Sequence, residues 1–413
     1  MENSLAMIQN QSNRSVLSRC FGSSLVLAAA LLLVTGGAKP AESQTYKVIH
    51  SFTAKQSDGG TPFGGPVLDK SGTLYGTTYT GGTYGAGSVY KLSPEGSNWK
   101  YRALYSFGGS TDGDAPGFGT LAIHNGALFG TTEGGLPFGV AFEVGPCTAT
   151  LCREKVVHAF GTGLDGAQPI GGVVFDPAGN MYGTTSEGGS TGYGTVFEIT
   201  ASGTETTLYN FAGGTDAANP PAGVTLDSVG NLYGTSSLGS GAYGFGAIYK
   251  LTRSGSTWTE SILYNFQGAD DGQYPVGGVI VDRAGNIYGG TFAGGLNGGG
   301  TVYELSPSGG SYTFNTLYSF TGGFSGVYNK LTFDTHGNLY GSTTGAGQNG
   351  YGLVFKLTPV TGGWTFTDLY DFADGDDGGQ PYGSLAVDSN GNIFGTTNLG
   401  GTDNEGVIFE ITP

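Results

Sequence analysis

The chain of 413 residues has little charge, and its basic residues are outnumbered. Charged side chains make up 12% of the sequence, and 16 Lys and Arg stand against 32 Asp and Glu, which gives a formal net charge of −16 at pH 7. Nucleic acids and anionic membrane surfaces bind clustered Lys and Arg. We therefore expect neither as a partner, and we expect the protein to be a monomer.

Cysteine is scarce, with three residues in the whole chain. Cys20 lies before an apolar run, and the other two, Cys147 and Cys152, lie close together in "GPCTATLCRE". The C-x-x-C spacing of redox motifs is absent. In an oxidising compartment such a close pair is typical of a local disulfide. We predict a Cys147–Cys152 bond.

Long apolar runs are absent after residue 34. Arg14 and Arg19 precede the run "LVLAAALLLV" at 25–34, and small residues follow it. This order is typical of a secretory signal, and the run is shorter than the ~20 residues that span a membrane. Residues 1–43 are predicted to be a signal peptide, cleaved after Ala38 or Ser43, with a periplasmic or extracellular product. The alternative is a run retained as an anchor.

Helical periodicity is also missing, although glycine is abundant at 81 residues. A phosphate-binding glycine loop lies between a strand and a helix. The stretch "GNMYGTTSEGGSTGYGTVFEIT" at 179–200 instead has strand-like flanks on both sides. No strict three-residue collagen period occurs, and 24 Tyr and 24 Phe provide apolar surface that disordered chains lack. A turn-rich all-β protein remains.

The strand-turn-strand pattern recurs seven times around an aromatic-glycine pair. From Tyr75 to Phe394 is 319 residues over six intervals, a mean of about 53, near the period of propeller blades. The third copy contains four strand-like runs, at 172–176, 180–186, 194–200 and 206–211. Four antiparallel strands per repeat predict a seven-bladed β-propeller over residues 44–413.

The two ends of the repeat region are complementary. Residues 46–52, "YKVIHSF", match the fourth strand of a copy, and residues 406–413, "GVIFEITP", match the third. We predict that the N-terminal strand completes the last blade, which removes an exposed sheet edge.

Two local features have structural interpretations. The glycine after the repeated aromatic is expected to make room for an aromatic ring of the adjacent sheet. Turn aspartates, mostly in "D-x-x-G-N", are expected to accept hydrogen bonds from turn N–H groups; they are Asp69, Asp176, Asp227, Asp282, Asp334 and Asp388.

The consensus "GNLYGTT..GG....GTVFKLTP", spread over residues 46–413, resembles the GloVer tandem repeat of exported bacterial proteins, named for the Gloeo- and Verruco- groups. The resemblance implies an exported repeat protein and no particular activity.

A second aspartate recurs between the blades as "D-G-x-x-P" or a close variant. In a propeller these connections share a face with the loops between the second and third strands, so the carboxylates either cap their own loops or ring one mouth of the channel as a cation or polyol site. We predict no cofactor, with calcium as the alternative, although the EF-hand spacing is absent. The residues are Asp58, Asp112, Asp165, Asp216, Asp271 and Asp377.

The sixth copy departs from the repeat. Its connection reads "GGFSGVYNKL", and Asn329 and Lys330 replace the small pair that opens the first strand elsewhere, which is Gly-Gly in three copies. Tyr328, Asn329 and Lys330 are therefore a candidate ligand-facing patch. The four histidines have no nearby Ser or Cys with an acidic partner, so a hydrolytic triad is not indicated.

Nearly equivalent blades favour a non-catalytic binding or scaffold module for a glycan, a peptide or an envelope component. No catalytic residues and no metal ligands are assigned. The less favoured alternative is a polysaccharide or lactone-ring lyase with its site at the channel mouth, and a third is a purely structural surface protein.

Overall fold

The computed structural model describes residues 44–147, 152–161, 163–239 and 244–413. In these ranges the chain forms strands and turns and no helix. No helix long and apolar enough to cross a membrane is present among them. The predicted signal peptide, residues 1–43, lies outside the described residues, so its cleavage site stays a prediction.

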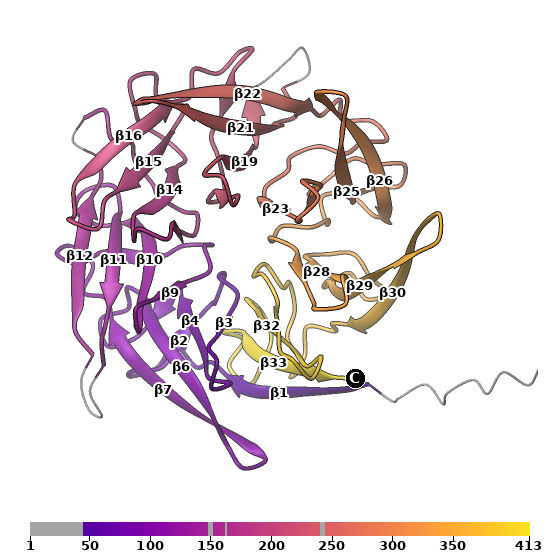
Figure 1. The fold of residues 1–413 in the computed structure, drawn as a ribbon. Coiled ribbons are helices and arrows are strands. Elements are labelled where there is room, and N and C mark those ends of the chain that lie inside the picture. Colours follow the sequence, from indigo (N-terminus) through magenta and orange to yellow (C-terminus); the bar gives the residue numbers. More distant parts are fainter. Residues whose placement is uncertain (1–43, 148–151, 162, 240–243) are drawn as a thin grey trace, which may run out of the picture. The chain divides into compact units, whose positions relative to one another are not determined.

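Seven antiparallel sheets of four or five strands form the blades, one for each sequence repeat (Figure 1). Two further two-stranded sheets pair β2 (Gly59–Gly60) with β5 (Thr80–Gly81) and β17 (Ala217–Ala218) with β20 (Leu238–Gly239). Blade 1 contains β3 (Val67–Leu68), β4 (Leu74–Thr78), β6 (Ser88–Glu95) and β7 (Asn98–Ser106). Blade 2 contains β8 (Asp114–Pro116), β9 (Ala122–His124), β10 (Ala127–Gly134), β11 (Val140–Val144) and β12 (Glu154–Ala159). Blade 3 contains β13 (Val174–Phe175), β14 (Met181–Thr185), β15 (Thr195–Ile199) and β16 (Glu205–Asn210).

The remaining blades repeat this order of strands. Blade 4 contains β18 (Thr225–Leu226), β19 (Leu232–Ser236), β21 (Ala247–Ser254) and β22 (Thr257–Asn265). Blade 5 contains β23 (Val279–Val281), β24 (Ile287–Gly290), β25 (Gly298–Ser308) and β26 (Ser311–Thr321). Blade 6 contains β27 (Thr332–Phe333), β28 (Leu339–Thr343), β29 (Leu353–Val360) and β30 (Gly363–Asp371), and blade 7 contains β31 (Ala386–Val387), β32 (Ile393–Thr397), β33 (Val407–Thr412) and β1 (Thr45–Ser51).

The burial of each strand explains its sequence pattern. The second strands are buried on both faces because neighbouring blades cover them, and every residue of β14, β19, β28 and β32 is buried. The fourth strands form the outer edge, and β22 and β30 alternate between exposed and half-buried residues over much of their length. Short runs of apolar, Gly, Thr and Ser residues without charge therefore mark the inner strands, and alternating runs mark the outer strands of the same sheet.

The first and last strands close the ring, as predicted. β1 pairs antiparallel with β33, with Tyr46 opposite Ile411 and Val48 opposite Phe409. Figure 1 shows β1 lying along β33 at the end of the last blade. The ring of Tyr46 also stacks on Tyr370 of blade 6, with centroids 3.8 Å apart.

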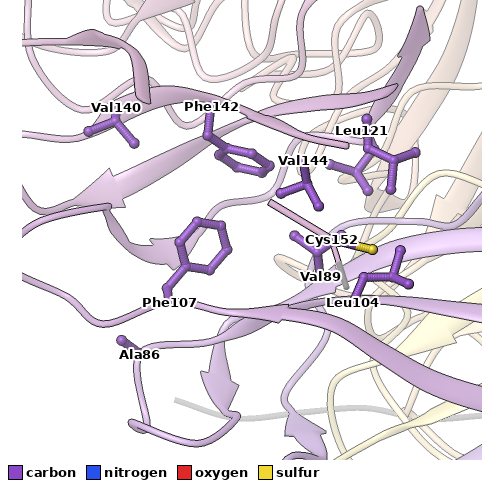
Figure 2. Close-up of a cluster of buried hydrophobic side chains, with 10 residues drawn as sticks. Ala86, Val89, Leu104, Phe107, Leu121, Val140, Phe142, Val144 and Cys152 are labelled. Atoms are coloured by element: carbon purple, nitrogen blue, oxygen red, sulfur yellow. The ribbon is translucent and has the colours of Figure 1, made fainter. Parts of the chain in front are cut away.

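Aromatic pairs join neighbouring blades. Phe107, just after the outer strand of blade 1, packs edge to face against Phe142 of blade 2, with ring centroids 5.0 Å apart (Figure 2). Each such pair buries a large apolar area at a blade interface. The other six interfaces repeat the contact as Phe160–Phe197, Phe211–Tyr249, Phe266–Tyr303, Phe320–Phe355, Phe372–Phe409 and Phe52–Tyr90.

The glycine of each aromatic-glycine pair makes room for one of these rings, but the ring belongs to the same sheet. A Cβ on Gly183 would lie 2.5 Å from Cζ of Phe197, which is its direct partner on the third strand of blade 3. The expectation of a ring from the adjacent sheet was therefore wrong. The cross-strand register, which the repeat pattern did not include, places the aromatic over the glycine.

The turn aspartates behave as predicted. Asp176 Oδ1 accepts hydrogen bonds from the backbone N–H groups of Ala178 (2.9 Å) and Asn180 (2.8 Å). Burial alone would raise the pKa of Asp176, but hydrogen bonds from Asn180 and Tyr182 bring it below its usual value.

Candidate functional site

The innermost part of the ring is built from seven short segments, one before or at the first strand of each blade. Here backbones of neighbouring blades meet directly: a Cβ on Gly65 would collide with the carbonyl oxygen of Ser384, and one on Gly223 with that of Gly172. Glycine is therefore required at these positions, because the backbones of neighbouring blades approach too closely to leave room for a Cβ.

These segments surround a central cavity of about 510 Å³, to which all seven blades contribute. Most of its lining is glycine backbone and apolar side chains. Toward the turns that follow the first strands the lining is apolar, and includes Leu68, Ala122, Val174, Ile280 and Phe333. The volume lies within the range of about 300–1,000 Å³ typical of small-ligand pockets.

One side of the cavity mouth carries an aromatic cluster, formed by Phe63, Phe118, Tyr328 and Tyr382. Ring centroids are 4.6 Å apart for Phe63 and Phe118, 4.8 Å for Tyr328 and Tyr382, and 5.8 Å for Phe118 and Tyr328. These residues come from the connections that lead into blades 1, 2, 6 and 7. The corresponding positions of blades 3, 4 and 5 hold Ile170, Pro221 and Val276, so the mouth is asymmetric.

Lys330 is the only charged residue lining the cavity, whose lining residues are all described. Its position is occupied by small residues in the other blades: Gly65, Thr120, Gly172, Gly223, Gly278 and Ser384. The backbone N–H of Lys330 donates to Ser384 Oγ at 3.2 Å. The ammonium has no hydrogen bond or ion pair with the part of the chain that the structure describes.

The surroundings of Lys330 disfavour its charged form. Protein atoms enclose the side chain, although it keeps some contact with the cavity space, and this burial lowers its pKa to about 8. The nearby phenols add no charge at neutral pH, because burial raises the pKa of both Tyr328 and Tyr382.

Asn329 has a different role from its two neighbours. It is buried, and its amide donates to Ser342 O (3.0 Å) and Ser342 Oγ (2.8 Å) in the same blade. Ser342 Oγ in turn donates to Pro381 O of the next connection at 3.2 Å. All three residues line the cavity, and the Asn329 side chain is bonded to Ser342, which links blade 6 to the connection that leads into blade 7.

The six connection aspartates lie outside the cavity lining, beside the outer strands. Asp377 is representative: it accepts from the N–H groups of Ala373 (2.9 Å) and Gly375 (3.1 Å) and from the hydroxyl of Tyr370 (3.0 Å). The others bond in the same way, Asp58 with His50 and Thr53, Asp112 with Tyr105 and Gly108, Asp165 with His158, Asp216 with Tyr209 and Ala212, and Asp271 with Tyr264 and Gln267. Among the described residues no group of three or more His, Cys, Asp or Glu could hold a metal ion.

Carboxyl pairs occur at three of these outer positions, because a glutamate of the next blade faces the connection aspartate. Burial and the charge of Asp112 raise the pKa of Glu154 to about 7. Burial and the neighbouring Asp216 raise that of Glu260 to about 9. Burial also raises the pKa of Glu205, with Asp165 acting in the same direction.

Sequence reasoning missed Phe63, Phe118 and Tyr382. Their signal was present, because four of the seven copies have an aromatic residue directly before the residue pair that opens the first strand, a pair that is small in three of the four. It was overlooked because each residue is ordinary within its own copy.

The predicted disulfide is confirmed: Cys147 and Cys152 are bonded. Cys152 packs into the core between blades 1 and 2, near Leu104 and Val89 (Figure 2).

Comparisons with known proteins agree with this architecture. The profile of the Gloeobacter/Verrucomicrobia repeat matches residues 39–242 and 227–413. No curated protein matches the chain. Among solved structures, an extracellular domain from B. thetaiotaomicron is 10% identical with a TM-score of 0.53, over 88% of this chain and 40% of that one.

A second solved structure is PorZ, a surface component of the type-IX secretion system of Porphyromonas gingivalis. It is 15% identical with a TM-score of 0.52, over 85% of this chain and 46% of that one. The chain spans less than half the length of each of these two structures, and at such identities the likeness shows the fold alone.

Proposed function

The chain belongs to the Gloeobacter/Verrucomicrobia repeat family, and from that premise we propose that it is an exported, non-catalytic binding module whose ligand docks at the mouth of the central cavity. One observation carries the proposal: a cavity of about 510 Å³ with an aromatic cluster on one side of its mouth. Ligand sites are typically concave and apolar with a few polar groups. The cavity has this character, whereas the connection aspartates are bonded within their own loops.

Export is supported by two independent features. The first 43 residues have the composition of a secretory signal, and the Cys147–Cys152 bond is typical of proteins folded in oxidising compartments. Periplasm and extracellular space are both compatible with these features. Once the signal is removed, we expect a monomer that binds neither nucleic acid nor an anionic membrane.

A binding module is favoured over a lyase at the same mouth. General acid–base catalysis needs groups whose pKa values lie near the working pH and that face one substrate from different sides. The cavity lining offers one such group, Lys330, and the two tyrosines beside it have raised pKa values. A second acid or base is absent from the lining.

The test is a binding screen of residues 44–413 against immobilised glycans, peptides and envelope components. If the ligand binds at the mouth, its affinity is lower for Tyr328→Ala and Tyr382→Ala than for the wild-type protein. Tyr84→Ala is the matched control, because Tyr84 is 71% exposed and lies outside the cavity lining. A hit that is indifferent to both cavity substitutions contradicts the proposed site, and the absence of any hit contradicts the binding function.

A further inference from the structure

We propose that the cavity selects a saccharide with a carboxylate, a uronic-acid unit, whose carboxylate pairs with Lys330 while its sugar ring lies against the aromatic cluster. This inference rests on the proposed function and deepens it, because it names the chemistry of the ligand.

The first argument is the unpaired cation. A buried ammonium without a counter-ion is unfavourable, since it has lost water and gained no partner. Lys330 lies in a ring of positions that are otherwise Gly, Ser or Thr, so the fold does not need a long side chain there. Its ammonium has no partner among the described residues. An anion in the cavity would supply the missing charge.

The second argument is the absence of competing charge. No Asp, Glu, His or Arg lines the cavity. The other titratable side chains that line the cavity are Tyr328 and Tyr382, which are neutral at physiological pH because burial raises their pKa values. Glu133 acts on Tyr328, but it lies outside the cavity lining and accepts a hydrogen bond from Tyr79 at 3.0 Å.

The third argument concerns the body of the ligand. The aromatic cluster lies beside the mouth and is built from four rings of neighbouring blades, which suits the flat, C–H-rich face of a pyranose. Serine and threonine hydroxyls, at Ser384 and Thr120, also line the cavity and suit sugar hydroxyl groups. A carboxylate on such a ring meets both the cluster and the cation.

Binding is coupled to a proton on Lys330. A carboxylate beside the ammonium stabilises its charged form, so the bound state has a higher Lys330 pKa than the free state. The charged form falls away as pH rises through about 8, and affinity falls with it. Binding near pH 8 is accompanied by proton uptake on the protein.

The experiment is calorimetric titration of residues 44–413 with galacturonate or glucuronate oligosaccharides, and with neutral galactose or glucose oligosaccharides of the same length. The wild-type protein is compared with Lys330→Met and Lys330→Ser, the latter reproducing the residue of blade 7. Lys100→Met is the control, on the outermost strand of blade 1 with its side chain 70% exposed. We expect the acidic ligand to bind at least about tenfold more tightly than the neutral one, and both cavity variants to lose that preference.

Each outcome decides the matter. Equal binding of acidic and neutral ligands, or a preference retained in Lys330→Ser, overturns the inference and leaves the binding function standing. A peptide whose C-terminal carboxylate binds through Lys330 while the uronates do not overturns the saccharide assignment. If no probe binds and the screen above is also empty, both proposals fail. Thermal unfolding of the two variants separates loss of binding from loss of fold.

Discussion

Individual residues in this protein are constrained mainly by contacts that leave no space for a Cβ. Gly183 lies under the ring of Phe197, and Gly223 meets the backbone of Gly172 in the next blade over. Such positions, together with the positive-φ turns that glycine favours, explain why 81 of the 413 residues are glycine, well above the usual share of about 7%. The repeated glycines follow from packing and not from flexible loops alone.

A Gly183→Ala substitution tests this packing. The new methyl would sit 2.5 Å from Cζ of Phe197, so either the ring or the strand must move, and we expect a loss of about 1–3 kcal/mol in the free energy of unfolding. Denaturant unfolding monitored by fluorescence measures it. Gly363→Ala is the control, because nothing lies within 4 Å of a Cβ there. Equal effects at the two sites would show that packing is not the cause.

The connection aspartates lead to a second residue-level prediction. Because Asp377 already accepts three hydrogen bonds from its own loop and Tyr370, we expect Asp377→Asn to lower stability by about 1–3 kcal/mol. Calcium should change the melting temperature of either protein no more than matched ionic strength does. A calcium-specific rise in the wild-type melting temperature would instead support the cation site that the recurring motif suggested.

At the scale of strands and connections, the blade interfaces combine an apolar interior with titratable outer ends. The aromatic pairs fill the interior, and carboxyl pairs such as Asp216–Glu260 lie beside the outer strands. Hydrogen bonds outweigh burial at the turn residue Asp227, so its pKa is lowered. At Glu260, burial and the neighbouring Asp216 outweigh the hydrogen bonds from Tyr209 and Ala217, so its pKa is raised.

The pH dependence of stability follows from Glu154 and Glu260. Their pKa values in the folded chain, about 7 and about 9, exceed the usual value of about 4.3 for an unfolded chain. The folded state therefore holds these protons more tightly, so this stability is complete below about pH 4.3 and is lost as pH rises through 7 and 9. The turn aspartates act oppositely and lose stability in strong acid.

We therefore expect a higher urea midpoint at pH 6 than at pH 9, and a smaller difference in Glu260→Gln. Glu95→Gln provides the comparison, since Glu95 is 68% exposed on the blade 1 hairpin. A Glu260→Gln protein with the wild-type pH slope would contradict the assignment.

At the scale of the whole molecule, closure depends on β1. A chain that begins at residue 53 leaves β33 with an open edge, removes the Tyr46–Tyr370 stack and takes Phe52 from its contact with Tyr90. We expect a loss of roughly 5 kcal/mol or more, since burying one core Phe alone is worth about 3–5. Calorimetry against a chain that begins at residue 44 measures it, and a peptide of residues 44–52 should restore part of the difference. Identical melting of the two chains would refute closure.

The global architecture could be predicted from the sequence because the same pattern occurs in seven copies. Residues 46–52 match the fourth strand of a copy and residues 406–413 match the third, which indicated that the N-terminal strand closes the ring. The cavity could not be predicted in the same way. Its mouth is assembled from Phe63, Phe118 and Tyr382, which are far apart in the chain and meet only when the ring is formed. The sequence marked Tyr328, Asn329 and Lys330 as unusual. It did not show that the Asn329 side chain is bonded to Ser342, whereas the Lys330 ammonium has no partner among the described residues.

The pairing of β1 with β33 also orders events in time. β1 is made first, but it cannot pair until β33 is present, and more than 350 residues separate Ser51 from Val407. Blades 1 to 6 each contain all their strands in one continuous stretch, so none of them needs the far end of the chain. The seventh blade therefore forms only when β33 is present, and a polypeptide interrupted before Val407 leaves β1 without its partner strand.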